Sequence, residues 1–267
     1  MSTDNYTAAN SRAIDAWVDD GWQWGIPISH GEYVAASSGK WGVLLTPQKP
    51  VPIDWFAPFM KDGRFDGVKL LGLASGGGQQ MPIFTALGAT CTVLDYSSRQ
   101  LDSERLVAKR EGYSIDIVKA DMTLRLPFDD EAFDVIFHPV ANCYIEDVQH
   151  VWNECFRVLK PGGVLLAGVD NGLAYLVDDE NAEPIVIVNK LPYNPVKDSA
   201  LRQKLIEQGE DSIQFSHTVE EQIGGQLKAG LVLTDLFEDT IDCLLGQYVP
   251  LFIASRAVKP LVSAKVQ

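Results

Sequence analysis

Residues 70–78, Leu-Leu-Gly-Leu-Ala-Ser-Gly-Gly-Gly, decide the fold. The apolar run at 68–74 has the length of a buried strand, and the residues up to position 86 continue with a helical pattern. Glycines in a strand-to-helix turn let a ligand approach the backbone where a Cβ would block it. The first turn of the helix offers unpaired N–H groups to an anionic ligand. The stretch therefore predicts either a ligand-binding βα turn or a tight βα turn without a ligand.

Further strands and helices alternate along the chain after this turn. The expected strands are residues 90–94, 114–119, 133–137, 164–169, 231–237 and 249–257, and the expected helices are residues 99–109, 147–159 and 219–228. Such alternation is typical of βαβ units, with a parallel sheet and helices on both faces. Only about ten residues, 238–248, separate the last two strands, too few for a parallel crossover. We expect a Rossmann-like, doubly wound α/β sheet of about seven strands, mostly parallel, with the last strand antiparallel.

Two segments interrupt the alternation. Residues 1–65 contain five of the six tryptophans, and either Asn10 or Ser11 is expected to cap a first helix over residues 12–19. Residues 171–217 suggest strands at 185–188 and 213–215 and a short helix at 201–208. We interpret them as an N-terminal aromatic-rich cap and an inserted lid. They cover a core formed by residues 66–170 and completed by residues 218–267.

Composition limits the classes of function. The chain has 267 residues and a net charge of −14, from 22 basic against 36 acidic side chains. This balance disfavours nucleic acid and anionic membrane surfaces as partners. No apolar run approaches the roughly 20 residues of a membrane helix, and residues 1–10 lack the plan of a signal peptide, so we expect a cytoplasmic protein. The four cysteines show no C-x-x-C spacing, which predicts buried or free thiols and no metal site.

An acid at the end of the second strand adds to the glycine turn. Asp95 lies 19 residues beyond Gly76, and at that distance in a nucleotide-binding βαβ unit an acid hydrogen-bonds ribose hydroxyls. The alternative is a helix N-cap, because Ser97 and Ser98 follow. The turn and the acid together do not separate a dinucleotide from another adenosine ligand.

Three later motifs narrow the choice. They are Ala120-Asp121-Met122 after the third strand, Phe133-Asp134-Val135-Ile136-Phe137-His138-Pro139 as the fourth, and Leu159-Lys160-Pro161-Gly162-Gly163 before the fifth. In this order the set resembles the class I S-adenosylmethionine-dependent methyltransferases, in the small-molecule group related to the ubiquinone-biosynthesis type. The resemblance covers residues 66–170 well and the last two strands by pattern. The loop at 73–80 is also similar to that of a bacterial methyltransferase subgroup.

The resemblance implies S-adenosylmethionine as cofactor, S-adenosylhomocysteine as product, and a role for each matching residue. The loop residues Ala74, Ser75, Gly76, Gly77 and Gly78 would lie against the methionine part. Asp95 would hold both ribose hydroxyls, Tyr96 would stack on the adenine, and Asp121 and the Met122 N–H would bind its edge. His138 and Pro139 would face the methionine amino group and the methyl. The chain departs from the family pattern at Gly72, where the family usually has an acid, and at Ala74, where it usually has glycine.

Methyl transfer from a sulfonium requires mainly alignment and exclusion of water. A general base is needed only when the acceptor must lose a proton. The candidates to act as base or touch the acceptor are His138, Asn142, Tyr144, His30 with Tyr33, and His217. Trp22, Trp24, Tyr33 and Trp41 are expected either to line the pocket of a small-molecule acceptor or only to attach the cap to the core. The sequence specifies neither the methylated atom nor the oligomeric state.

Three other functions share part of this pattern. A nicotinamide-dependent oxidoreductase would use the same turn and Asp95. A non-catalytic cofactor-binding protein is suggested by Gly72, which lacks the acid of the family. A serine hydrolase is the weakest alternative, because Ser75 lies one position late for G-x-S-x-G.

Overall fold

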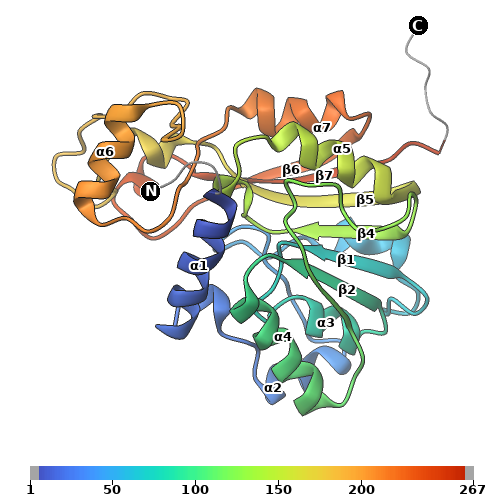
Figure 1. Cartoon of the computed structure of the whole chain (residues 1–267). Helices are drawn as coiled ribbons and strands as arrows, with labels where there is room; N and C mark the ends of the chain where they lie inside the picture. Colours follow the sequence, from blue (N-terminus) through green and yellow to red (C-terminus); the bar gives the residue numbers. More distant parts are fainter. Residues whose placement is uncertain (1–5, 262–267) are drawn as a thin grey trace, which may run out of the picture.

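The computed structural model describes residues 6–261 (Figure 1). Seven strands form one sheet in the order β3-β2-β1-β4-β5-β7-β6. The strands are β1 (Lys69–Leu73), β2 (Thr90–Asp95), β3 (Asp116–Lys119), β4 (Phe133–His138), β5 (Leu159–Asp170), β6 (Val232–Asp239) and β7 (Phe252–Val258). The first five pair in parallel, and β7 lies between β5 and β6, antiparallel to both. The predicted fold class and the antiparallel last strand are confirmed.

Helices cover both faces of this sheet. The α-helices are α1 (Tyr6–Asp19), α2 (His30–Ser37), α3 (Met81–Ala86), α4 (Ser98–Glu111), α5 (Val148–Val158), α6 (Ser199–Gln208) and α7 (Gly225–Lys228). The 3₁₀ segments are η2 (Gln23–Gly25), η3 (Ile53–Phe59), η4 (Asn142–Tyr144), η5 (Leu173–Leu176) and η7 (Leu245–Gln247), and a π-helical segment η6 (Glu220–Gly224) precedes α7. In Figure 1, α5 and α7 lie on one side of the sheet, and α3 and α4 lie on the other.

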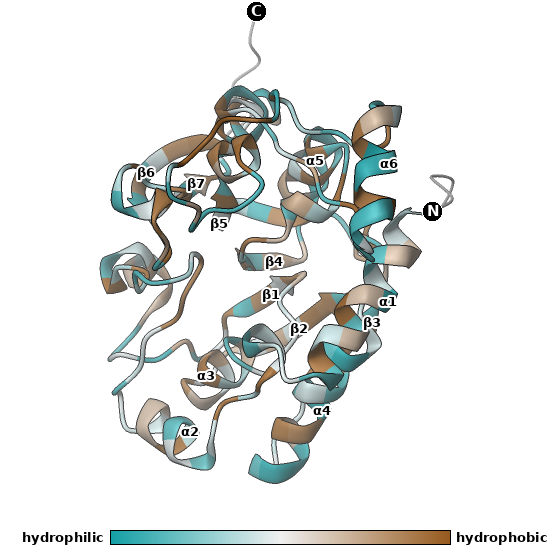
Figure 2. Cartoon of the chain, turned by 90° about the vertical axis from the view of Figure 1, so that its left-hand side faces the viewer, coloured by the Kyte–Doolittle hydropathy of each residue, from teal (hydrophilic) through white to brown (hydrophobic). Residues whose placement is uncertain are grey.

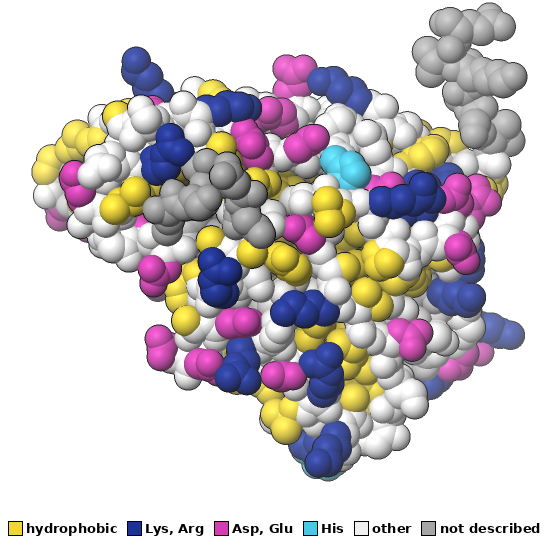
Figure 3. Space-filling model, in the orientation of Figure 1, with side chains coloured by type: hydrophobic (Ala, Val, Ile, Leu, Met, Phe, Trp, Pro, Cys, Tyr) yellow, Lys and Arg dark blue, Asp and Glu magenta, His cyan; other side chains and the backbone are white. Residues whose placement is uncertain are grey.

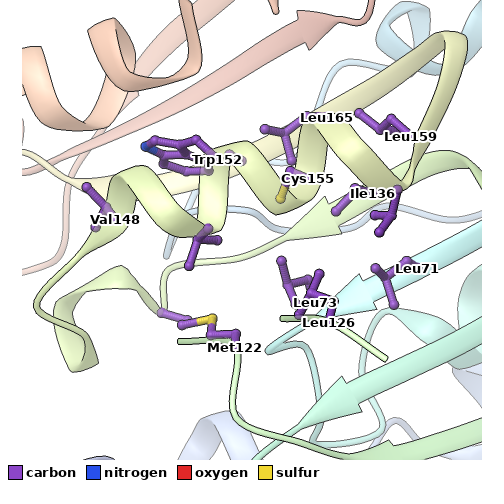
Figure 4. Close-up of a cluster of buried hydrophobic side chains, with 14 of the residues drawn as sticks. Leu71, Leu73, Met122, Leu126, Ile136, Val148, Trp152, Cys155, Leu159 and Leu165 are labelled. Atoms are coloured by element: carbon purple, nitrogen blue, oxygen red, sulfur yellow. The ribbon is translucent and has the colours of Figure 1, made fainter. Parts of the chain in front are cut away.

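Successive side chains of β1 point to opposite faces of the sheet and pack into two different hydrophobic cores. Leu71 and Leu73 pack with Trp152 of α5 in one core, drawn in Figure 4, whereas Leu70 packs in the other. A strand buried on both faces needs a continuous apolar run, which is why residues 70–73 show no polar alternation. Figure 2 shows apolar residues concentrated in the strands, while α4 carries both apolar and polar residues.

The structure corrects several predicted elements. The first helix begins at Tyr6, so Asn10 and Ser11 lie inside it rather than at its cap. Strand β5 begins at Leu159 rather than 164, because Leu159 already pairs with Phe133. Residues 185–188 and 213–215 form no strand. Residues 1–5, which belong to the segment expected to lack a signal peptide, lie outside the described residues.

Two segments gather at the end of the sheet where the parallel strands finish. Helix α1 and the insertion that carries α6 both lie there, as Figures 1 and 2 show.

On the face drawn in Figure 3, basic and acidic side chains are interspersed. Among residues 6–261, no helix is long and apolar enough to cross a membrane, and no group of three or more His, Cys, Asp or Glu side chains is arranged to hold a metal. All four cysteines are buried and free.

Candidate functional site

Three neighbouring cavities lie along the carboxyl ends of the strands. The α1 cavity has walls from α1 and from the ends of β2 and β3, and it is lined by Asn10, Ser11, Ile14, Trp22, Leu94, Asp95, Tyr96, Asp121, Met122 and Tyr144 among others. The loop cavity, of about 320 Å³, is lined by Trp24, Leu45, Thr46, Ala74, Ser75, Gly76, Gln80, Pro139 and others. The insertion cavity, of about 580 Å³, is lined by Asp170, Tyr175, Asp178, Glu180, Tyr193, Lys204, Glu210 and others.

Shared wall residues place these cavities in a row. Ala74, Asp95 and Gln100 line both the α1 cavity and the loop cavity. Val140 and Phe252 line both the loop cavity and the insertion cavity. The row has the loop cavity in its middle, at the carboxyl ends of β1 and β4. In open α/β sheets, ligands bind at this edge.

Asp95 joins the glycine turn to the second strand. Its Oδ2 accepts from the Gly76 N–H at 3.1 Å and its Oδ1 from the Ser97 N–H at 2.9 Å. Burial raises the pKa of Asp95 to about 6, against the effect of these backbone hydrogen bonds, so the carboxyl is ionised at pH 7 and above. The Ser97 side chain, not Asp95, caps α4 by accepting from the Gln100 N–H at 3.1 Å. Each Asp95 oxygen keeps a lone pair for a further donor.

Gln100 adds a second acceptor to the shared wall. This side chain is 7% exposed, and its Oε1 is buried without a hydrogen-bond partner among the described residues. A Cβ at Gly76 would lie 2.6 Å from the Gln100 Cβ and 3.0 Å from Asp95 Oδ2. The glycine therefore leaves room beside Asp95 and Gln100, two residues that line both cavities. The Asp95 carboxylate can accept from two hydroxyls, so this shared wall fits a hydroxyl-bearing compound such as a ribose.

The other two glycines of the turn do not line the cavities. A Cβ at Gly77 would meet the Trp24 carbonyl at 2.3 Å, and the Gly78 N–H donates to Oε1 of Glu104 at 2.9 Å. Close approach of the protein's own backbone and of α4 is what requires glycine here. Glu104 is fully buried, which raises its pKa to about 8, so the carboxyl is largely protonated at pH 7.

Gly72 has a structural explanation. A Cβ at this position would lie 2.7 Å from the Met81 sulfur. Met81, at the start of α3, is fully buried and occupies the space into which a side chain at position 72 would project. The acid that the family usually has at this position would not fit beside Met81.

His138, which is expected to face the cofactor, is not among the residues that line these three cavities. It is 0% exposed, Nδ1 lies 2.8 Å from the Leu73 carbonyl, and Nε2 lies 2.9 Å from Asn142. Burial lowers the pKa of His138, so the ring is neutral and donates only one N–H, to Leu73. With the amide groups of Asn142 and Gln222 both turned over, the Asn142 NH₂ donates to Nε2 of His138 and the Asn142 Oδ1 accepts from the Gln222 NH₂. His138 and Asn142 thus belong to a buried network, and neither is carried forward as a base.

The remaining candidates divide between cavity walls and other places. Trp22, Tyr96, Asp121, Met122 and Tyr144 line the α1 cavity, and Trp24, Ser75 and Pro139 line the loop cavity. The others lie elsewhere. His30 pairs with Glu111 on the surface, Tyr33 stacks on Tyr113, Trp41 packs with core phenylalanines, and His217 is buried against the Asn142 and Ile145 carbonyls.

Sequence reasoning missed the contribution of α1. Asn10, 3% exposed, accepts from the Ile213 N–H at 2.7 Å and donates to the Ile213 and Tyr144 carbonyls at 2.8 and 3.0 Å. The helix thereby forms a wall of the α1 cavity and holds the end of the insertion. A polar residue on the apolar side of a helix was the available signal, but its partners lie 134 and 203 residues away.

Comparison with known proteins adds independent evidence. A family model described as a methyltransferase domain matches residues 71–167. The chain is 42% identical over 256 residues to the uncharacterized methyltransferase YbaJ of Bacillus subtilis (strain 168), covering 94% of this chain and 98% of that protein. It is 30% identical over 119 residues to a ubiquinone biosynthesis O-methyltransferase of Chelativorans sp. (strain BNC1), covering 43% of this chain and 47% of that protein.

A solved structure has a similar fold over most of its length. The 1,6-didemethyltoxoflavin-N1-methyltransferase of Burkholderia thailandensis, crystallised with 1,6-didemethyltoxoflavin and S-adenosylhomocysteine, superposes with a TM-score of 0.59 at 13% identity. The match covers 97% of this chain and 91% of that one. At this identity the likeness shows the fold alone.

Proposed function

The chain belongs to the class I S-adenosylmethionine-dependent methyltransferases, and we propose that it transfers the methyl group to a small-molecule acceptor by in-line displacement. The methyltransferase family membership sets aside the nicotinamide-dependent oxidoreductase, the non-catalytic protein and the serine hydrolase. The observation that carries the proposal is the row of three cavities, joined by Ala74, Asp95 and Gln100 on one side and by Val140 and Phe252 on the other. Such a row accommodates a cofactor and an acceptor end to end.

The α1 cavity and the loop cavity would together hold the cofactor. Asp95 would accept from the ribose hydroxyls. Tyr96, Met122 and Trp22 provide apolar surface for a flat base, and Asp121 provides an acceptor at its edge. Ala74, Ser75, Gly76 and Pro139, which line the loop cavity, would lie against the methionine part.

When bound, the cofactor supplies a methyl group on a positively charged sulfur, which is already a good leaving group. The residues of this chain therefore have to orient the acceptor and keep water out. Val140 and Phe252 form the boundary between the loop cavity and the insertion cavity, and we place the acceptor against them. The lid residues 171–217 would shield this boundary from solvent.

A product assay tests the proposal. The purified chain is incubated with S-adenosylmethionine and mixtures of small molecules, and S-adenosylhomocysteine and +14 Da products are measured by mass spectrometry. We expect acceptor-dependent formation of both, with loss of turnover in Asp95→Ala. Turnover of a protein or RNA fraction but of no small molecule would contradict the proposed acceptor class.

A further inference from the structure

The insertion cavity has a wall chemistry that differs from that of the other two cavities. Among its described lining residues are four carboxyl groups, Asp170, Asp178, Glu180 and Glu210, and one ammonium group, Lys204. The Lys204 ammonium lies 2.6 Å from the Asp178 carboxylate, so its charge is already compensated within the wall. The remaining carboxyl groups give this cavity a negative potential.

Asp170 is the buried member of this set. It ends β5, it is 6% exposed, and its Oδ1 accepts from the Gly172 N–H at 3.0 Å. Its Oδ2 is buried with no hydrogen-bond partner among the described residues. Burial raises the pKa of Asp170 to about 6, so the carboxyl remains an anion above neutral pH. A buried anionic oxygen without a partner is costly, and a rotation of this side chain toward the cavity that Asp170 lines would let a ligand that donates a hydrogen bond remove that cost.

Asp170 also lies next to the boundary with the loop cavity. In the sheet it is the direct partner of Phe252, one of the two residues that line both cavities. A group held at Asp170 is therefore next to the place where the acceptor meets the cofactor site. The same cavity wall contains Tyr175 and Tyr193, whose ring centres are 5.1 Å apart. Tyrosine faces attract cations at short range, so the aromatic wall and the carboxyl groups favour the same kind of ligand.

We propose, on the basis of the methyl-transfer function above, that the acceptor is a small cationic amine whose ammonium or N–H group is bound by Asp170 beneath the insertion. Asp170 is then the residue that selects the acceptor by charge. The proposal concerns binding of the amine and applies whichever atom of the acceptor receives the methyl.

The test uses three phenols of nearly the same shape and different charge. Tyramine carries an ammonium group, 4-ethylphenol is neutral, and 4-hydroxyphenylacetate carries a carboxylate. Each is titrated by calorimetry into the full chain saturated with S-adenosylhomocysteine. We expect tyramine to bind at least tenfold more tightly than the other two. Equal affinities, no measurable binding of any probe, or a preference for the anion would overturn the proposal.

Two variants test whether the preference for the cationic probe depends on Asp170. Asp170→Asn should reduce tyramine affinity at least tenfold while leaving S-adenosylhomocysteine affinity within twofold. Glu207→Gln, on the exposed side of α6 and outside the cavity wall, should change neither. If Asp170→Asn does not fold, the relative affinities of the three phenols for the unmodified chain still test whether the acceptor site prefers a cation. Failure to bind S-adenosylhomocysteine would count against the proposed function, whereas loss of the charge preference alone would count against this inference only.

Discussion

The carboxylate of Asp95 accepts a hydrogen bond from the Gly76 N–H at 3.1 Å, which joins the acid that ends β2 to the glycine turn that follows β1. The same carboxylate lines both the α1 cavity and the loop cavity. The Asp95 side chain thus holds the glycine turn in place and also forms part of the wall of both cavities. The first prediction follows from this double role.

Asp95→Ala should weaken binding of S-adenosylhomocysteine roughly 10- to 150-fold, since loss of a hydrogen bond to a charged acceptor costs on the order of 1.5–3 kcal/mol. Isothermal titration calorimetry measures the change. Asp116→Ala is the matched control, because Asp116 lies at the opposite, amino-terminal end of its strand β3. Equal affinities for Asp95→Ala and the unmodified chain would remove Asp95 from the cofactor site.

The alternation of strands and helices was sufficient to predict the sheet, because parallel strands buried on both faces leave continuous apolar runs such as residues 70–73. The predicted glycine turn, Asp95, Tyr96 and Asp121 depend on local spacing, and the structure brings Gly76 and these three residues to the walls of neighbouring cavities.

Features that depend on distant contacts could not be predicted in the same way. Asn10 resembles a helix cap in the sequence, but its partners are Tyr144 and Ile213. Residues 185–188 have the composition of a strand, yet they have no neighbouring strand to pair with and form none. His138 ends a strand, as expected, but its environment is set by Asn142 and by the helix that carries Trp152.

Asn10→Ala should loosen the end of the insertion. The substitution removes three hydrogen bonds and leaves the buried Ile213 N–H without an acceptor, which costs on the order of 1–3 kcal/mol. Hydrogen exchange followed by mass spectrometry should show that residues 212–216 exchange faster in Asn10→Ala than in the unmodified chain, while the strands exchange at the same rate in both. Unchanged protection of this segment would contradict the role assigned to Asn10. Asn189→Ala, elsewhere in the insertion, serves as the control.

Glu104→Gln should flatten the dependence of stability on pH. The pKa of Glu104 is raised from an ordinary value near 4.5 to about 8 in the folded chain. The folded state keeps its proton while the unfolded state loses it, so stability is lost as pH rises from about 4.5 to 8, by up to about 1.4 kcal/mol per pH unit. Denaturant unfolding at several pH values measures the slope. Identical slopes for Glu104→Gln and for the exposed-site variant Glu207→Gln would show that Glu104 does not titrate in this way.

Gly72→Ala should destabilise the chain by roughly 1–3 kcal/mol, because the added Cβ overlaps the Met81 sulfur. Gly72→Ala should lower the free energy of unfolding by less in a chain that also carries Met81→Ala, because the space next to position 72 is then free. A double-mutant cycle from thermal unfolding measures this coupling. Strict additivity of the two effects would contradict the explanation given for Gly72.

The central claim is that the α1 cavity and the loop cavity bind the cofactor with Asp95 at its ribose. Calorimetric titration of the purified full chain with S-adenosylhomocysteine tests it most directly. We predict saturable binding with one molecule per chain, reduced at least tenfold in Asp95→Ala and unchanged in Asp116→Ala. Absence of binding by the unmodified chain, or binding that is indifferent to Asp95, would contradict the claim.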